Sequence, residues 1–326
     1  MKVALIGDVM LGRGVGERIA TKAPEAFWGN TLTVLRSADV VIANLECAIT
    51  RSSKRWLRTP KVFHFRAPPA AVKVLQAAGI RLVSLANNHV LDYETEGLLE
   101  TIAQLDAASI AHAGAGANLA AAAAPAIVTV NGIRVGLVAF TDNEPTWAAA
   151  HDRAGTNFIR ISCEDESLDR VRAGVAAARA QDADLVVLSL HWGPNMNPAP
   201  TPEFRAFARA AVKLGADLIF GHSAHIVQGL AVYQRVPVFY DLGDYLDDYA
   251  IDPELRNDWS FIALLNYQRN IGWPEITLLP VRLSYAEVNL ARAAEAAEIM
   301  KRMSQRSARL GTTLLADHAS LRLEIT

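Results

Sequence analysis

The stretch RLVSLANNHVLDY, residues 81–93, passes from apolar residues directly into three polar side chains. Its first part is a short apolar run, which is typical of a strand buried on both faces. Asn87, Asn88 and His89 follow where such a strand should end. In layered α/β folds, ligands bind beyond the carboxyl ends of the strands. The stretch therefore predicts both a buried strand and one edge of a functional site.

The same form recurs along the chain. Four more apolar runs end on polar residues: KVALIGD (2–8), DVVIANLE (39–46), DLVVLSLHWG (184–193) and DLIFGH (217–222). Residues 68–79 and 94–109 have the amphipathic pattern of helices, and Asn131-Gly132 predicts a hairpin turn between two further strands. This alternation favours an α/β fold in which helices flank a sandwich of sheets.

Composition restricts the class of protein. The chain has 326 residues, of which 51% are hydrophobic and 20% charged, as in a globular protein. We expect a single domain over residues 1–326, with a C-terminal helix over about 286–310 packed on it. A formal net charge of −2 argues against nucleic acid as a partner. The first apolar run, Val3 to Ile6, is too short for a signal peptide, so we expect a cytoplasmic protein without a membrane anchor.

Residues that can bind metal or move protons gather at the predicted strand ends. Taken singly, each has an ordinary explanation: Asp8 can cap a helix, Glu46 can be solvated, His191 can be a core histidine, and Asn87 and Asn88 can form a loop. Together they require a common explanation, because buried carboxylates and imidazoles are costly unless they are paired or bound to metal. The set at these strand ends is Asp8, Glu46, Asn88, His89, His191, His222 and His225.

The ligand types restrict the metal. Carboxylate, amide oxygen and imidazole together suit manganese, iron or zinc, whereas calcium prefers oxygen ligands and structural zinc prefers thiolates. Cys47 directly follows Glu46, and the alternation of side chains along a strand would turn it the other way. We therefore expect one or two divalent ions and no catalytic thiol.

Several blocks of the sequence, in order, resemble one known family. GDVMLGR, ANLECAIT, SLANNHVLDY, LSLHWG, GADLIFGHSAHIVQG and YDLGDYLDD look like blocks of the CapA family, the poly-γ-glutamate capsule synthesis proteins, from about residue 1 to about residue 250. That family is similar to the calcineurin-like metallophosphoesterases. The resemblance implies a four-layered α/β/β/α sandwich with a mononuclear or dinuclear metal centre.

The resemblance also implies roles for individual residues. The implied metal ligands are Asp8, Glu46, Asn88, His191, His222 and His225. His89 would be the acid or base beside the metal, and Asn87 and Asp92 would support that pair. The predicted catalytic set is His89 and Asp92 together with Arg13, whose guanidinium can hold an anionic group or lie free on the surface.

The chain departs from the usual pattern of these families at several positions. Met10 stands where the phosphoesterases have a histidine, so we expect one of the two metals to be weakly bound or absent. Ser223 replaces a second histidine after His222, and Asp244 stands where asparagine is common.

Three functions remain open from the sequence. In the first, a metal-dependent hydrolase cleaves a phosphoester or an amide, with His89 moving a proton. In the second, His89 and another base epimerise a Cα centre next to a metal-bound carbonyl. In the third, a non-catalytic module holds poly-γ-glutamate in the pocket. The expected partner is a small-molecule or peptide substrate, and an anionic one if Arg13 contacts it.

Overall fold

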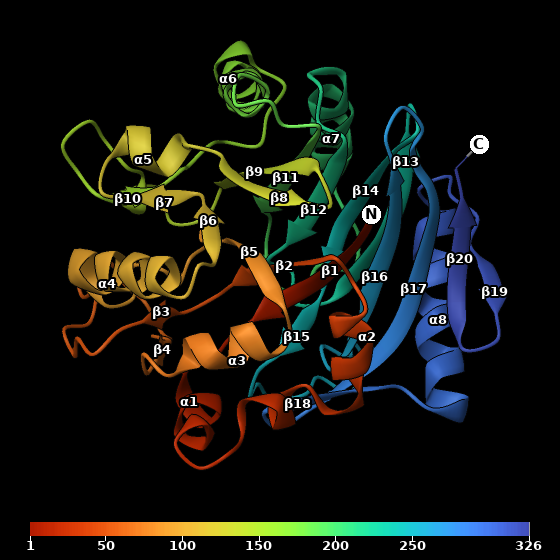
Figure 1. Ribbon diagram of the computed structural model, residues 1–326, viewed down its shortest axis with the longest axis horizontal. Coiled ribbons are helices and arrows are strands. Elements are labelled where there is room, and N and C mark those ends of the chain that lie inside the picture. Colours follow the sequence, from red (N-terminus) through yellow and green to blue (C-terminus); the bar gives the residue numbers. More distant parts are fainter. Residues whose placement is uncertain (326) are drawn as a thin grey trace.

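The computed structural model describes residues 1–325 and contains two large β-sheets (Figure 1). Thr326, the last residue of the predicted domain, lies outside the described residues. The first sheet is ten-stranded, with the order β19-β20-β17-β16-β1-β2-β5-β6; β15 also pairs with β1, and β18 with β17. Its strands are β1 (Lys2–Val9), β2 (Val40–Leu45), β5 (Ile80–Ser84), β6 (Ala111–Ala113), β15 (Asp244–Leu246), β16 (Trp259–Gln268), β17 (Gly272–Ser284), β18 (Glu287–Leu290), β19 (Leu315–Asp317) and β20 (Ser320–Glu324).

The second sheet is six-stranded, with the order β13-β14-β12-β11-β9-β8. Its strands are β8 (Ala126–Val130), β9 (Ile133–Thr141), β11 (Leu185–His191), β12 (Leu218–His222), β13 (Val227–Tyr233) and β14 (Val236–Leu242). Two small sheets pair β3 (Ala48–Ile49) with β4 (Arg66–Ala67), and β7 (Ala115–Gly116) with β10 (Gly155–Thr156). The central strands β1, β2 and β5 of the first sheet and β9, β11, β12 and β14 of the second are parallel within their sheets.

Helices cover the outer faces of the two sheets. The α-helices are α1 (Arg13–Ile19), α2 (Leu32–Arg36), α3 (Ala71–Ala77), α4 (Glu94–Ala107), α5 (Leu119–Ala123), α6 (Asp165–Arg179), α7 (Pro202–Lys213) and α8 (Ala293–Ala308), and the short 3-10 turns are η1 (Pro24–Phe27), η2 (Gly29–Thr31) and η3 (Pro145–Trp147). Figure 1 shows α3 and α4 on one side of the molecule and α6 and α7 on the other. Among residues 1–325, no helix has both the length and the apolar character needed to cross a membrane.

Three clusters of buried hydrophobic residues fill the spaces between these layers. One lies between the first sheet and the helices that include α3 and α4. A second joins the facing sides of the two sheets, where Leu5 of β1 and Val187 of β11 belong to the same cluster. A third packs α6 and α7 on the second sheet, through residues such as Val171 and Phe207. The predicted α/β/β/α sandwich is therefore confirmed.

Local sequence signals explain particular turns and contacts. Asn131 and Gly132 have φ angles of 50° and 76°, as a two-residue hairpin requires, and they join β8 to β9 as predicted. A Cβ atom on Gly7 would lie 1.8 Å from the carbonyl oxygen of Gly243. Only glycine fits there, and this close approach sets the chain around residue 243 beside the end of β1.

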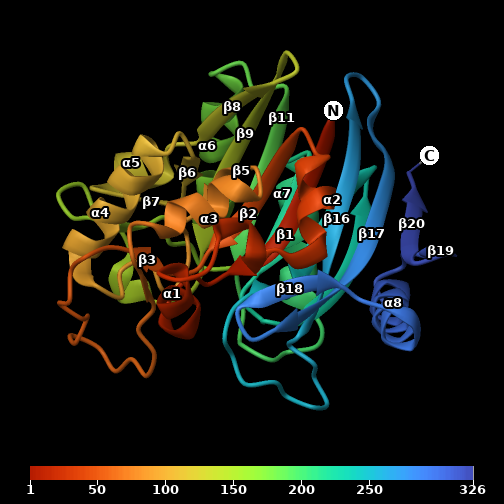
Figure 2. The same ribbon diagram turned by 60° about the horizontal axis from the view of Figure 1, so that its bottom comes forward.

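The C-terminal helix differs from the prediction at its start. The expected helix over 286–310 begins at Ala293, because Glu287–Leu290 forms β18 and pairs with β17. Helix propensity in this segment is overridden by strand pairing, with Val288 fully buried in the core. The helix itself packs on β13, β17 and β20. Figure 2 shows it at one end of the sandwich, beside β20.

Candidate metal centre

The polar residues at the strand ends form two rows, one in each sheet. In the first sheet, Asp8 is the register partner of Asn44 on β2 and of Asp244 on β15. In the second, His191 on β11 is the register partner of His222 on β12. The rows face each other because the parallel strands of both sheets end on the same side of the molecule. The sandwich thus brings residues more than 200 positions apart into one site.

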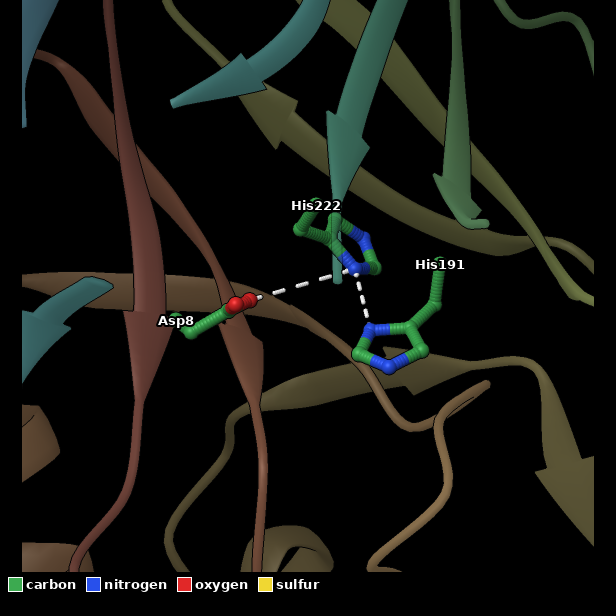
Figure 3. Close-up of side chains that lie close together, drawn as sticks. All are labelled: Asp8, His191 and His222. Atoms are coloured by element: carbon green, nitrogen blue, oxygen red, sulfur yellow. Dashed lines mark hydrogen bonds and ion pairs between the residues drawn. The ribbon is translucent and has the colours of Figure 1, made fainter. Parts of the chain in front are cut away.

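The first group of possible metal ligands is Asp8, His191 and His222, which Figure 3 shows pointing toward one another. The ligand atoms of this group all lie within 4.8 Å of one another. The two Nδ1 atoms of His191 and His222 are 2.8 Å apart, and Asp8 Oδ1 is 4.0 Å from His222 Nδ1. Asn88 joins this group, since its Oδ1 lies 3.1 Å from His191 Nε2.

The second group is Asp8, Glu46, His225 and Asp244, and it shares Asp8 with the first. His225 Nδ1 lies 2.8 Å from Asp244 Oδ1 and 3.5 Å from Asp8 Oδ2. His225 Nε2 lies 4.0 Å from Glu46 Oε1. After β12 ends, Ser223 and His225 adopt positive φ angles of 112° and 60°. Such backbone is sparsely populated outside glycine and clusters at functional sites, and here it forms the turn that carries His225.

Unpartnered oxygens indicate that these residues suit a cation. Both carboxylate oxygens of Glu46, together with Oδ2 of Asp8 and Oδ2 of Asp244, are buried and make no hydrogen bond to any residue among 1–325. Buried carboxylates without partners are costly, and a divalent ion would remove that cost. Carboxylate, amide and imidazole ligands together suit manganese, iron or zinc. The donor set therefore fits one ion at each group, with Asp8 placed between them.

The pKa shifts of these side chains are also consistent with a metal site. Burial and the nearby charge of Asp8 raise the pKa of Glu46 well above its usual value. Burial opposes the charged form of His225, but the charges of Asp244 and Glu46 outweigh it and raise its pKa. Burial lowers the pKa of His222 to about 3. The first group thus offers a neutral imidazole, and the second brings several carboxyl groups close together, a crowding that raises the pKa of Glu46.

Neighbouring side chains fix the orientation of these groups. Ser189 Oγ lies 2.7 Å from His222 Nε2, which leaves Nδ1 of that ring facing Asp8. Asn44 donates from Nδ2 to Asp8 Oδ1 at 2.8 Å, and Asn87 donates to the Asn44 side-chain oxygen at 3.0 Å. Partners of this kind hold ligands in place. Asn87 is therefore linked to Asp8 through Asn44.

His89 stands apart from the two groups and pairs with Asp92. Its Nδ1 lies 2.6 Å from Asp92 Oδ2, and its Nε2 lies 3.9 Å from Glu46 Oε1. The Phe65 ring stacks on the imidazole, with 4.0 Å between ring centroids. Burial and the nearby charge of Lys61 lower the pKa of His89 well below its usual value, which favours the neutral ring. We assign the Nδ1–H tautomer, which leaves Nε2 able to accept a proton.

Asp92 is held by the segment between β3 and β4. Its Oδ2 accepts a hydrogen bond from the Phe65 backbone N–H at 2.6 Å, and its Oδ1 lies 3.4 Å from Lys61 Nζ. Lys61 also donates to the Asn88 carbonyl at 2.6 Å, and its side chain is only 6% exposed. Lys61 thus contacts both Asn88 and Asp92, the partner of His89.

Arg13 lines the same cavity as His89. This cavity, of about 330 Å³, is also bordered by His225 and Tyr249. The guanidinium lies near the aromatic ring of Phe65, at 5.6 Å, and its Nε is 3.3 Å from Asp248 Oδ1. Of the predicted site residues, Arg13, His89 and His225 line this cavity, and the others are linked to them through the contacts described above. Met10, in contrast, takes no part and accepts a hydrogen bond from Gly12 through its sulfur.

Sequence reasoning missed three contributors. Asp244 was noticed as a departure from the family pattern, yet it completes the second group. Ser189 lies two residues before His191, a spacing that places both on one face of a strand and could have identified it. Lys61 lies on an irregular segment, where neither periodicity nor a strand end indicates a role.

Comparisons with known proteins agree on a family. The family model described as "Bacterial capsule synthesis protein PGA_cap" matches residues 2–249. The chain is 35% identical over 285 residues to a probable polyglutamine synthesis accessory protein of Mycobacterium tuberculosis, covering 76% of this chain and 74% of the relative. It is 31% identical over 250 residues to the capsule biosynthesis protein CapA of Bacillus anthracis, covering 76% of this chain and 60% of that protein.

The matches among solved structures are more distant. A hypothetical protein from Thermus thermophilus matches with 16% identity and a TM-score of 0.44, over 89% of this chain and 96% of the other. The sulfate thiohydrolase SoxB of Thermus thermophilus matches with 11% identity and a TM-score of 0.47, over 97% and 61%. The sequence relatives and the family model are therefore decisive: the chain belongs to the PGA_cap family of bacterial capsule synthesis proteins, the CapA family.

Proposed function

We propose that this protein is a metal-dependent hydrolase that cleaves an amide or phosphoester bond, with His89 as its acid and base. The observation that carries the proposal is the placement of the His89–Asp92 pair against the second ligand group, with His89 Nε2 3.9 Å from Glu46 Oε1. A divalent ion bound at these groups would supply Lewis-acid activation of water and of a substrate oxygen.

The proposed mechanism assigns metal binding, proton transfer and anion binding to different side chains. Asp8, Glu46, His191, His222, His225, Asn88 and Asp244 would hold the ion or ions. Asp92 holds His89 in the Nδ1–H tautomer, so that Nε2 can take a proton from the attacking water and return it to the leaving group. Burial of this pair and the Phe65 ring against it exclude bulk water. Arg13, at the border of the same cavity, would bind an anionic group of the substrate.

The names of the relatives favour an amide. They are described by capsule, PGA or polyglutamine synthesis, and chains of amino acids are joined by amide bonds. We therefore place a peptide-type substrate ahead of a phosphoester.

The test uses metal-loaded protein and two isotopes. The protein, loaded with manganese, zinc or iron, is incubated with oligoglutamate and with phosphoester substrates in ¹⁸O-labelled water. Hydrolysis should place solvent oxygen in a product, and the activity should vanish on chelation and return with metal. The same reaction in heavy water should leave the Cα positions free of deuterium.

Other outcomes would overturn the proposal. Deuterium on Cα without bond cleavage would identify an epimerase. Tight binding of oligoglutamate with no turnover of any substrate, and no effect of His89→Gln, would identify a binding module.

A further inference from the structure

A second recess adjoins the cavity of the metal centre, and four arginines are among its lining residues. It measures about 610 Å³. We call it the arginine recess and define it by Arg13, Arg51, Arg55 and Arg66, with Pro68 and Tyr93 among its other lining residues. Arg13 also lines the cavity that contains His89, so the two spaces meet at this side chain. A ligand held in the recess can therefore extend to the reacting groups.

The charge of the recess differs from that of the chain. Overall, 32 basic residues stand against 34 acidic ones. Four arginines and one acidic residue, Glu17, line the recess. Arg13 and Arg51 pair with Asp248 and Glu100, which are not lining residues, and Arg55 and Arg66 add two further positive charges. Concave surfaces lined by one sign of charge concentrate ligands of the other sign. The recess is thus suited to an anionic ligand although the protein as a whole is not basic.

Two of these arginines have no acidic partner among residues 1–325. Within residues 1–325, no carboxylate lies within 4 Å of the guanidinium of Arg55 or of Arg66. Arg66 donates only to the Ser52 carbonyl, at 2.8 Å, and lies over the Tyr93 ring. By contrast, Arg256, Arg282 and Arg322 each contact two carboxylates. The forks of Arg55 and Arg66 are therefore available to a ligand.

The remaining lining indicates what kind of anion fits. Pro68, Pro69 and Tyr93 offer apolar surface among the charges, which suits methylene groups. Glu17 is exposed and can accept a hydrogen bond from a backbone amide. A chain of phosphates has neither methylenes nor amide donors. An acidic peptide has both methylene groups and amide donors, and its planar carboxylates match guanidinium forks.

We propose that the arginine recess binds the carboxylates of an acidic peptide chain whose next amide bond lies at the metal centre. This assignment deepens the proposed function and rests on it for the position of the cleaved bond. The binding itself depends only on the recess.

The experiment measures binding separately from cleavage. The probe is fluorescein-labelled hexaglutamate, followed by fluorescence anisotropy on metal-loaded His89→Gln protein, which should not consume it. The double variant Arg55→Gln with Arg66→Gln, in that background, should bind at least about 10-fold more weakly, since it loses two charge-assisted contacts. Raising the salt concentration should weaken binding to the parent more than to the double variant.

Matched controls test whether net charge alone matters. Arg160 and Arg309 are exposed and have no ion-pair partner among residues 1–325. Arg160→Gln with Arg309→Gln changes the net charge equally and should bind hexaglutamate like the parent. Labelled hexaglutamine should bind weakly to all variants.

The results separate the two proposals. If the recess variant binds hexaglutamate like the parent, or if tripolyphosphate displaces the probe at lower concentration than unlabelled hexaglutamate does, the assignment of the recess fails even when hydrolysis is observed. If the recess variant loses binding but no protein cleaves any substrate, the recess stands and the hydrolase proposal fails.

Discussion

Asp8 and Asp244 are register partners on the adjacent parallel strands β1 and β15, although 236 positions separate them in the sequence. Both are buried, and both belong to the group that includes Glu46 and His225. Asp244 therefore supplies the second group with a carboxylate, while Met10 supplies it with nothing. The departure at Met10 does not leave that group without ligands.

Asp244→Asn should remove one metal ion and spare the other. The substitution keeps the shape of the side chain but removes a charge from the second group only, because the first group consists of Asp8, His191 and His222. We expect metal content per chain to fall by about half in protein that holds two ions. Elemental analysis of dialysed protein measures this. Loss of all metal, or of none, would contradict the division into two groups.

Glu46→Gln should have opposite effects on the metal-free and the metal-loaded protein. Without metal, it removes a buried carboxylate that has no hydrogen-bond partner, so the melting temperature should stay equal or rise. With metal at 100 times its dissociation constant, the parent should gain about 2.7 kcal/mol, and the variant less.

Thermal unfolding with and without chelator provides the measurement, with Glu254→Gln at an exposed position as the control. A variant that is destabilised without metal and still gains fully from metal would show that Glu46 has a structural role.

His89→Gln should lower kcat by roughly 10²–10⁴-fold, the usual contribution of a positioned acid or base. His89 belongs to neither ligand group, so metal content should be unchanged. Kinetics, metal analysis and thermal unfolding are measured on one preparation. An inactive variant that has also lost metal and stability would refute the acid/base role, because it would indicate that the His89–Asp92 pair mainly holds the loop in place.

Lys61→Met should lower activity less than His89→Gln does. Its ammonium group lies 3.4 Å from Asp92 Oδ1, so removing it would release the carboxylate that orients His89. Changes at supporting residues of this kind cost roughly 10–100-fold in activity, and we expect the loss in kcat rather than in KM. Lys61→Arg should restore part of it. Lys54→Met, on the same segment but 65% exposed, is the matched control and should be neutral.

The two cysteines should differ sharply toward a thiol reagent. Cys47 is fully buried, and burial raises the pKa of its thiol to about 12, whereas Cys163 is exposed. Because the thiolate is the reactive form, native protein should react at one thiol, and the second should react only on unfolding. Counting thiols with a chromogenic disulfide before and after adding denaturant checks this. Rapid modification of Cys47 accompanied by loss of activity would reopen a catalytic role for it.

The sequence by itself determined the layers, and it predicted which polar side chains stand at the strand ends. Continuous apolar runs marked the buried strands, and Asn131-Gly132 marked a hairpin, because strand burial and turn geometry depend on neighbouring residues. The polar residues at the strand ends, such as Asp8 and His222, were predicted to lie near one another because parallel strands end on a common side of the sheet.

Only the tertiary structure decided which strands are neighbours. Asp244 enters the site because β15 pairs with β1, and Lys61 enters because an irregular segment packs against Asp92. The start of α8 at Ala293 depends on pairing between β18 and β17. Such contacts join distant parts of the chain, and the local pattern carries no information about them, because packing across the sandwich selects the partner.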